Sequence, residues 1–546
     1  MTAITNQPKT PLEMFYQWER TAPEHIFLRQ PKALQWTEYS WGQVADQVRR
    51  VTAFLRAQNY PAGSRIAIWS ANSKDWPIVD LAISLAGHVS VPLYPGQDVE
   101  SARYIFEHSE SRMVFLGSFD QWQRADATIP DIPRIAMLGA QAACGQTLEQ
   151  VIAAHAPYAE SPLPDPDSTW TIVYTSGTTG NPKGVVHAHV TPGHVCPDLN
   201  GAFKTGVGQA RYFSYLPMSH IAERILVSMA ALYCNGTISF SEGLATFADE
   251  MRSVQPTFFF SVPRLWIKFK EGIDAKIPPA MQAHLTAEQR KGIARQLGLG
   301  EATYIITGSA PCPRDVQQWF LDMGILLRDG YGMTENCIHG IGWIHNDQPK
   351  AGCIGRPFTE RIEVKLSEEN EILMRSKALM KEYYKEPEKT AEVLVDGWYH
   401  TGDTGRFDEE GDLWITGRLS EVFKTTKGKF VRPANLENLF GRCELLAQFC
   451  VFGHGLDQPA VVVTLSESGL KTDRADLTER LSTLLKEINA ELPPWERIPQ
   501  LFIAGSEWTI ANGLLTPTMK LKRKFIEERF REWVNANTGK TAIVFE

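Results

Sequence analysis

A strand–helix–strand pattern near the N-terminus constrains the fold of this chain more than any other feature. Residues 65–69 are apolar enough for a buried strand, and residues 89–94 form a second apolar run. Between them lies a helical segment that ends near Ala86 and that Asn72 or Ser73 is expected to cap. Two strands joined by one helix make a right-handed crossover between parallel neighbours. The pattern therefore predicts an α/β fold built on parallel sheets.

The same alternation of strand and helix recurs in the middle of the chain. The expected strands are residues 258–262, 303–307 and 325–327, and the expected helices are residues 263–272 and 313–323. At 546 residues the chain is too long for a single hydrophobic core, so two or more domains are expected. The first and larger domain is expected to be α/β with parallel-rich sheets.

The character of the sequence changes near residue 360. Residues 360–374 alternate apolar and polar side chains, which is typical of paired antiparallel strands, and a polar turn at 408–412 predicts a hairpin. The tail has its own elements, with strands expected at 449–452 and 460–465 and helices at 477–492 and 524–534. We therefore place a domain boundary at residues 418–421.

Composition and charge narrow the functional classes. The net charge of −8 argues against a general nucleic-acid binder, and the charge run at 381–392 is interpreted as a solvated helix face. The eight cysteines include no C-x-x-C pair, which argues against structural zinc or a disulfide framework and favours a reducing, cytoplasmic location. The N-terminus has no apolar signal core, and no apolar run approaches the roughly 18 residues that a membrane span needs. Peripheral membrane contact and a homodimer stay open.

The stretch from Tyr174 to Gly184 carries the strongest chemical signal. Its sequence is Tyr-Thr-Ser-Gly-Thr-Thr-Gly-Asn-Pro-Lys-Gly, directly after an apolar run. Small residues let backbone N–H groups close on an anion, the hydroxyls add donors, and Lys183 adds a positive charge. The stretch is not a P-loop, because glycine follows the lysine where Ser or Thr would stand, and a strand is expected next. We interpret it as a hairpin loop that grips a polyphosphate; the alternative is a solvent-exposed turn.

Four further motifs suit a nucleotide, and each also has a plain structural interpretation. Residues 330–335 (Gly-Tyr-Gly-Met-Thr-Glu) offer a ring to a base, a hydroxyl to a phosphate and a carboxylate to Mg²⁺, or else form a glycine turn with a packed tyrosine. Residues 398–403 (Trp-Tyr-His-Thr-Gly-Asp) offer an aspartate to ribose, or only a turn residue. Arg418 could hold a ribose or phosphate oxygen, or lie free on the surface. The basic cluster at 516–524 is either a solvated face or a loop whose lysine reaches a phosphate as a mobile cation.

In this order the five motifs resemble one family, the adenylate-forming acyl-activating enzymes, which include acyl-CoA synthetases, luciferases and peptide-synthetase adenylation domains. Residues 215–224 (Tyr-Leu-Pro-Met-Ser-His-Ile-Ala-Glu-Arg), residues 262–266 and the Lys-Thr-Thr-Lys-Gly-Lys loop look most like long-chain fatty-acyl-CoA synthetases. The resemblance implies an N-terminal adenylation domain at 1–417 that includes a distorted β-barrel subdomain. It also implies a hinge at 418–420 and a small mobile α+β domain at 421–546.

The resemblance implies roles for individual residues. The expected nucleotide-binding residues are Thr175, Ser176, Gly177, Thr178, Thr179, Gly180, Lys183, Gly308, Ser309, Ala310, Asp329, Tyr331, Gly332, Asp403 and Arg418. The expected catalytic residues are Thr334 at the α-phosphate, Glu335 as the Mg²⁺ ligand, His220 beside the acyl carboxylate, and Lys520. The expected CoA tunnel is formed by Lys427, Gly428 and Lys429, and the expected hinge residue is Ser420.

Two positions depart from the family pattern. Most relatives have Ser-Gly-Lys where this chain has Thr518-Met519-Lys520, so Lys522 stays an alternative to Lys520. Ser420 stands where Asp or Lys is usual, which puts the energetics of the hinge in question but not the reaction.

The function that the resemblance implies is ATP- and Mg²⁺-dependent ligation of a medium- or long-chain fatty acid to coenzyme A. An acyl-adenylate would be the intermediate, and pyrophosphate and AMP would be released. One alternative is a fatty acyl-AMP ligase that passes the acyl group to a carrier-protein phosphopantetheine, and another is a nucleotide- and lipid-binding sensor without turnover. The apolar residues of 219–234 have helical spacing, so they are either ordinary core or the wall of an acyl tunnel.

Overall fold

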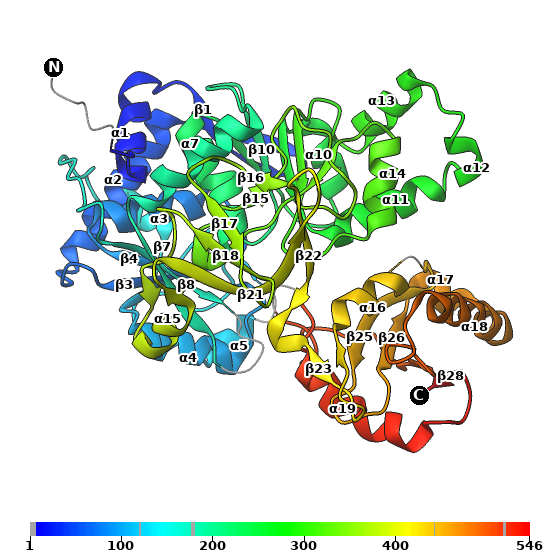
Figure 1. Ribbon diagram of the computed structural model, residues 1–546. Helices are drawn as coiled ribbons and strands as arrows, with labels where there is room; N and C mark the ends of the chain where they lie inside the picture. Colours follow the sequence, from blue (N-terminus) through cyan, green and yellow to red (C-terminus); the bar gives the residue numbers. More distant parts are fainter. Residues whose placement is uncertain (1–6, 120–121, 176–180, 442, 517–519) are drawn as a thin grey trace.

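The computed structural model describes residues 7–119, 122–175, 181–441, 443–516 and 520–546 (Figure 1). Two large sheets form the main body, and each is parallel except at one edge. The first runs in the order β14 (Leu327–Asp329), β13 (Tyr304–Thr307), β12 (Phe258–Ser261), β10 (Arg211–Ser214), β11 (Thr237–Phe240), β1 (Ile26–Lys32) and β2 (Gln35–Ser40). The second runs in the order β19 (Glu382–Tyr383), β9 (Lys183–Ala188), β8 (Thr169–Thr175), β4 (Val89–Leu93), β3 (Arg65–Trp69), β5 (Met113–Leu116), β6 (Arg134–Ala136) and β7 (Gln146–Thr147). The α/β prediction is confirmed.

Helices pack on these sheets around one large core, which both sheets share, and smaller separate cores. The helices are α1 (Pro11–Thr21), α2 (Trp41–Ala57), α3 (Asp75–Leu85), α4 (Val99–Ser109), α5 (Trp122–Asp126), α6 (Leu148–Ala154), α7 (Thr191–Phe203), α8 (Ile221–Glu223), α9 (Ala230–Cys234), α10 (Phe247–Val254), α11 (Pro263–Asp274), α12 (Pro279–Gln282), α13 (Ala287–Gln296) and α14 (Arg314–Asp322). A π-helical segment, η1 (Arg224–Met229), joins α8 to α9. The same core holds Ile68 of the second sheet and Ile238 of the first, so the two sheets bury their faces together.

Helix α3 is buried along its whole length, as a helix enclosed by other elements must be. The predicted cap is wrong: Lys74 precedes α3 and makes no side-chain capping bond. Asn72 instead reaches the loop after β10, where its amide nitrogen donates to the Leu216 carbonyl oxygen at 2.6 Å. A tertiary partner for Asn72 therefore replaces the local one that the sequence suggested.

A fully buried ion pair connects α3 to the π-helical segment. The Arg224 guanidinium donates to Asp80 Oδ1 at 2.6 Å, and the two side chains are 0% and 3% exposed. It also donates to Ser90 of β4 at 2.8 Å and to Thr171 of β8 at 2.7 Å. Its Cζ lies 4.1 Å from the centroid of the Trp170 ring. Both terminal nitrogens of the guanidinium therefore have partners, while its Nε has none among the described residues. Pairing of this kind is the condition for burying a charge.

An antiparallel sheet follows the parallel ones. Its strands are β17 (Glu363–Leu366), β18 (Glu371–Arg375), β21 (Trp398–Phe407), β20 (Leu394–Val395) and β22 (Leu413–Arg418), and a short pair, β15 (Ile341–Gly342) and β16 (Arg356–Pro357), precedes it. The hairpin predicted around 408–412 is confirmed, as β21 pairs with β22. The interpretation of 381–392 as a helix face holds only for α15 (Pro387–Val393), because β19 pairs with β9 and Tyr383 is buried.

The C-terminal segment forms a domain with its own cores, seen in Figure 1 as an orange and red lobe beyond β22. Its strands are β23 (Phe423–Lys424), β24 (Phe430–Val431), β25 (Leu446–Phe452), β26 (Ala460–Leu465), β27 (Leu501–Ile503) and β28 (Ile543–Phe545). Its helices are α16 (Pro433–Phe440), α17 (Glu467–Lys471), α18 (Arg474–Glu491) and α19 (Arg523–Asn537). Alternate residues of β26 pack on α18 and on α19, so each helix covers one face of this sheet. Within the described ranges, no helix combines the length and apolarity needed to cross a bilayer.

Candidate active site

The predicted adenine-binding residues lie where two parallel strands end. Gly308, Ser309 and Ala310 follow β13, and Tyr331 follows the neighbouring strand β14. A Cβ atom on Gly308 would lie 2.9 Å from the Gly330 carbonyl oxygen, so the two loops approach this closely only because glycine is present. The carboxyl edge of an open parallel sheet is the usual ligand-binding edge. The structure therefore brings these two predicted motifs together.

The predicted ribose-binding residues, Asp403 and Arg418, form an ion pair, and Tyr331 is hydrogen-bonded to the aspartate. The Tyr331 hydroxyl donates to Asp403 Oδ2 at 2.7 Å, and Arg418 Nε lies 3.0 Å from Asp403 Oδ1. Asp403 and Arg418 face each other in the β21–β22 register. Burial raises the pKa of Asp403, and the positive charge of Arg418 opposes that rise. Asp329, at the end of β14, is also buried, and burial raises its pKa to about 7.

The phosphate end of the site is organised around Tyr383. Lys183 begins β9 opposite Thr175 of β8, and its Nζ lies 4.8 Å from the centroid of the Tyr383 ring. The Tyr383 hydroxyl donates to Glu335 Oε1 at 2.8 Å, so one side chain connects the predicted phosphate-binding cation to the predicted magnesium ligand. Ser176, Gly177, Thr178, Thr179 and Gly180 lie outside the described residues. The sequence interpretation missed Tyr383, whose only signal was a tyrosine pair inside a charged segment.

A second residue that the sequence interpretation missed is His187. It lies on β9, is fully buried, and its Nε2 donates to the Thr334 carbonyl oxygen at 2.7 Å. Burial lowers the pKa of His187 to about 4, so the ring is neutral. The Met380 amide also donates to the carbonyl oxygen of Glu335, at 2.7 Å. The His187 bond fixes the short 3₁₀ turn η2 (Thr334–Asn336) against β9, and the Met380 bond holds its other side.

His220, the residue predicted to lie beside the acyl carboxylate, is influenced by the charge of Lys520. His220 Nδ1 accepts a hydrogen bond from the Ala222 amide at 3.1 Å, so the neutral ring carries its proton on Nε2. Loss of hydration and the positive charge of Lys520 lower the pKa of His220 to about 3. Lys520 comes from the C-terminal domain and retains exposed surface. Surrounding protein and the charge of Arg418 lower its pKa, while Asp403 and Glu335 oppose that shift. Electrostatic coupling thus ties Lys520 to four predicted site residues, His220, Glu335, Asp403 and Arg418.

The predicted CoA-tunnel residues lie in the C-terminal domain, between β23 and β24. Gly428 occupies a turn between β23 and β24 with a φ of +75°, a conformation that favours glycine. Lys429 Nζ lies 5.1 Å from the centroid of the Trp495 ring, within the same domain. Ser420 lies in the exposed 3₁₀ turn η3 (Leu419–Glu421) that links β22 to this domain.

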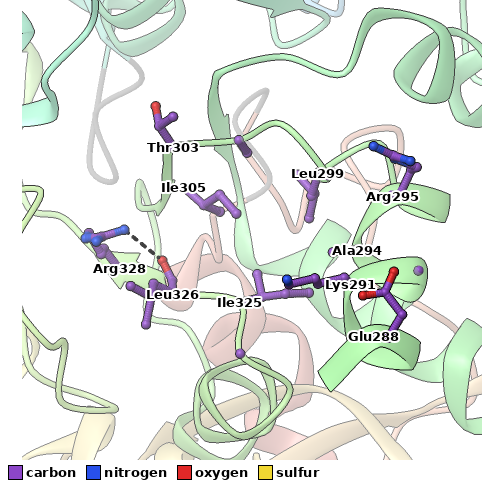
Figure 2. A pocket seen from close by; sticks show the side chains of 14 residues that line it. Glu288, Lys291, Ala294, Arg295, Leu299, Thr303, Ile305, Ile325, Leu326 and Arg328 are labelled. Atoms are coloured by element: carbon purple, nitrogen blue, oxygen red, sulfur yellow. Dashed lines mark hydrogen bonds between the residues drawn. The ribbon is translucent and has the colours of Figure 1, made fainter. Parts of the chain in front are cut away.

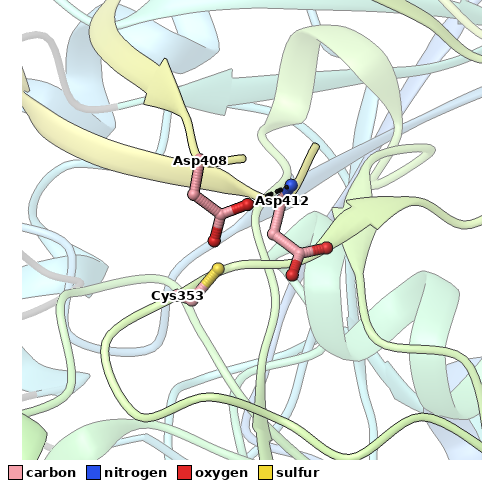
Figure 3. Close-up of side chains that lie close together, drawn as sticks. All are labelled: Cys353, Asp408 and Asp412. Carbon is pink, nitrogen blue, oxygen red and sulfur yellow. Dashed lines mark hydrogen bonds between the residues drawn. The ribbon is translucent and has the colours of Figure 1, made fainter. Parts of the chain in front are cut away.

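Two other features do not belong to this site. A cavity of about 420 Å³ lies between α13 and the amino-terminal ends of β13 and β14, at the opposite edge of the sheet (Figure 2). Cys353, Asp408 and Asp412 face one another with ligand atoms within 4.8 Å (Figure 3). The Lys350 ammonium lies 3.1 Å from Asp408 and 2.5 Å from Asp412, and Arg356 Nε lies 2.6 Å from Asp412, so two cations already pair with these carboxylates.

Taken together, the sheets, the convergent polar residues and the C-terminal lysine define an adenylate-forming enzyme. Residues 15–384 match the model of the AMP-binding enzyme family, and residues 421–538 match that of the AMP-binding enzyme C-terminal domain. Because the first match spans more than half of the chain, the protein belongs to this family of acyl-activating ligases.

Long-chain-fatty-acid–CoA ligases align with nearly the whole chain. It is 26% identical to the long-chain-fatty-acid–CoA ligase FadD15 of Mycobacterium bovis, with 96% of each chain covered. It is 29% identical to the long-chain-fatty-acid–CoA ligase 6 of Homo sapiens, with 93% of this chain and 83% of that protein covered. Among solved structures, the fold is similar to the A domain of a carboxylic acid reductase from Segniliparus rugosus in complex with AMP and a co-purified carboxylic acid. That comparison has a TM-score of 0.79 at 22% identity and covers 97% of this chain and 94% of the other.

Proposed function

We propose that this protein ligates a medium- or long-chain fatty acid to coenzyme A through an acyl-adenylate, with release of pyrophosphate and AMP. The observation that carries the proposal is that the charges of Glu335, Asp403 and Arg418 all act on Lys520, so its cation would meet the phosphates of an ATP bound at these residues. The names of the curated relatives, at 26–29% identity, support a long-chain acid and CoA as substrates.

The first half-reaction brings two anions together. Two unit charges 4 Å apart repel by about 4 kcal/mol at an effective dielectric constant near 20. Lys183 and Lys520 would offset this repulsion at the phosphates. Glu335 fits magnesium, because its carboxylate is a hard oxygen ligand held in place by Tyr383. When bound, Mg²⁺ would neutralise charge on the phosphate oxygens.

His220 would orient the fatty acid. Its Nδ1 is already occupied by the Ala222 amide, so the Nε2–H is the group available to a ligand. A neutral donor can hold one carboxylate oxygen and leave the other free to attack the α-phosphorus. Thr334 and Tyr331 would hold the adenylate in line for that attack.

The second half-reaction requires a different arrangement of the C-terminal domain. Lys520 occupies space that a thiol must enter, so we expect rotation about residues 418–420 once pyrophosphate has left. The turn at Lys427-Gly428-Lys429 would then line the path of the pantetheine arm. Its glycine permits close approach of the arm, and its lysines would attract the phosphates of CoA.

Gly428→Leu is expected to slow thioester formation by roughly tenfold or more, since a side chain at this positive φ costs about 1–2 kcal/mol and would obstruct the arm. Pyrophosphate release without CoA should persist. The two half-reactions are measured separately, by pyrophosphate release and by transfer from supplied acyl-AMP. Gly539→Leu is the matched control, because Gly539 has a φ of +81° elsewhere in the same domain. Equal effects of the two variants on transfer would contradict the tunnel assignment.

The proposed function is tested by a pyrophosphate-release screen across carboxylic acids of varied length, with CoA present or absent. Product mass distinguishes acyl-CoA from an acylated carrier protein, which is the second candidate acceptor. Binding of ATP and a fatty acid without any AMP or pyrophosphate would instead indicate a sensor, and would refute the proposal.

A further inference from the structure

The buried carboxyl group of Glu223 connects the two ends of the loop that carries His220. The loop leaves β10 at Ser214 and enters α8 at Ile221. The Ser214 hydroxyl donates to Glu223 Oε1 at 2.8 Å, which ties the start of the loop to the helix that follows it. The Glu223 side chain is only 1% exposed. Its hydrogen bond therefore lies beneath the loop and not in the solvent.

Asn72 extends this contact across the loop. Its amide nitrogen donates to the Ser214 hydroxyl at 2.8 Å, and its Oδ1 accepts from the Met218 amide at 2.9 Å. With its bond to the Leu216 carbonyl, one side chain holds three points of the loop. Asn72, Ser214 and Glu223 thus form one chain of hydrogen bonds across the loop that carries His220.

The groups around Glu223 leave it as a neutral acid at physiological pH. Burial raises the pKa of Glu223 to about 8, and hydrogen bonds from Ser214 and the Tyr215 backbone limit the rise. Burial likewise raises the pKa of Tyr215, so its phenol is uncharged. Arg224, the next residue, is committed to Asp80. His220, three residues earlier, is neutral for the reason given above.

The helix that begins at this point is irregular. Immediately after Glu223 the chain makes the π-helical segment η1, which is fully buried. Such π-bulges are rare and concentrate at functional sites, where they redirect side chains. Here the irregular turn directs two neighbouring ionisable side chains to different partners, because Glu223 is bonded to Ser214 of β10 while Arg224 is bonded to β4, β8 and α3.

We propose that Glu223 is a positioning residue: as a neutral acid, and together with Ser214 and Asn72, it holds the His220 loop in the shape that binds the acyl carboxylate. The inference rests on the proposed function. An ionised Glu223 would place a second anion near the carboxylate that must bind, in surroundings of low dielectric constant, and would weaken acid binding. When Glu223 is neutral, the Nε2–H of His220 can donate to the carboxylate of the fatty acid without a nearby negative charge opposing it.

The kinetic test compares the wild type with Glu223→Gln and Glu223→Ala from pH 6 to pH 9.5. For the wild type, KM for the fatty acid should rise as pH passes about 8, with KM for ATP unchanged. Glu223→Gln keeps a neutral partner for Ser214, so it should retain low KM at pH 7 and lose the alkaline rise. Glu223→Ala should raise KM for the acid at least about tenfold at every pH, the loss expected for one buried hydrogen-bonding group.

Glu250→Gln is the matched control. Glu250 is also fully buried and accepts from Ser241 at 2.7 Å and from Thr246 at 2.9 Å, on α10. This variant should keep the wild-type alkaline rise. An alkaline rise that persists in Glu223→Gln, or a Glu223→Ala effect that falls equally on KM for ATP, would overturn the inference. A wild type that releases no pyrophosphate with any acid would instead refute the proposed function and the inference with it.

A stability measurement tests the neutral acid without using activity. The folded pKa of Glu223 lies above its ordinary value of 4.5, so between pH 4.5 and about 8 the folded chain binds a proton that the unfolded chain has lost. Wild-type stability should therefore fall with rising pH across this window relative to Glu223→Gln. A difference in Tm between the two proteins that does not change from pH 5 to pH 8 would refute the protonation assignment.

Discussion

Lys520→Ala is expected to reduce acyl-adenylate formation by at least about 10²-fold, the usual effect of removing one preorganised donor from a developing negative charge. The lysine is coupled electrostatically to Glu335, Asp403 and Arg418, and its removal leaves the phosphate end of the site with Lys183. Pyrophosphate release from ATP and a fatty acid measures this step. Thioester formation from supplied acyl-AMP should survive, because in the proposed mechanism that half-reaction does not use the lysine.

Lys522→Ala is the matched control for this experiment. The sequence motif left both lysines as candidates, but Lys522 Nζ lies 5.3 Å from the centroid of the Phe525 ring, within its own domain. This variant should keep both half-reactions. Equal losses in the two half-reactions of Lys520→Ala, or a greater loss of adenylation in Lys522→Ala, would reject the role assigned to Lys520.

Asp80→Ala is expected to destabilise the N-terminal domain by about 3–5 kcal/mol, the usual cost of leaving a buried charge without its partner. Arg224 has no exposed surface through which water could replace the lost carboxylate. Urea unfolding followed by tryptophan fluorescence measures the change. Glu467→Ala, in the exposed Glu467–Lys471 pair, is the control and should have little effect.

The double variant Asp80→Leu with Arg224→Met separates the charge from the packing. Removal of both charges eliminates the uncompensated group, so the double variant should be more stable than Asp80→Ala alone. An Asp80→Ala variant with the unfolding midpoint of the wild type would show that the ion pair does not stabilise the fold.

Much of the architecture could be predicted from local patterns. Hydrophobic periodicity is a local property of the sequence, so it predicts secondary structure well. It predicted the strand–helix–strand unit at 65–94, the hairpin around 408–412, and the strands and helices of the tail. The nucleotide-binding motifs were also accessible, because glycines and hydroxyl residues in a fixed order have few other uses. Tyr331, Asp403 and Arg418 are indeed adjacent in the structure.

The site residues that were not predicted from the sequence are defined by contacts between distant parts of the chain. Tyr383 meets Glu335 only because β19 pairs with β9, about 200 residues earlier in the chain. His187 looked like an ordinary strand residue until its partner, the Thr334 carbonyl, was placed. Asn72 resembled a helix cap, and its true partners lie more than 140 residues away. A pattern read along the chain cannot distinguish such partners from local ones.

The β19–β9 pairing also limits where this enzyme can be recombined with others. Tyr383 lies beyond β18 of the antiparallel sheet, yet it completes the edge of the second parallel sheet next to Lys183. In a chimera joined between β18 and β19, the strand paired with β9 and the residue bonded to Glu335 would both come from the other parent. Crossover points for exchanging specificity should fall after residue 384, so that the parental β9–β19 edge is inherited as one unit.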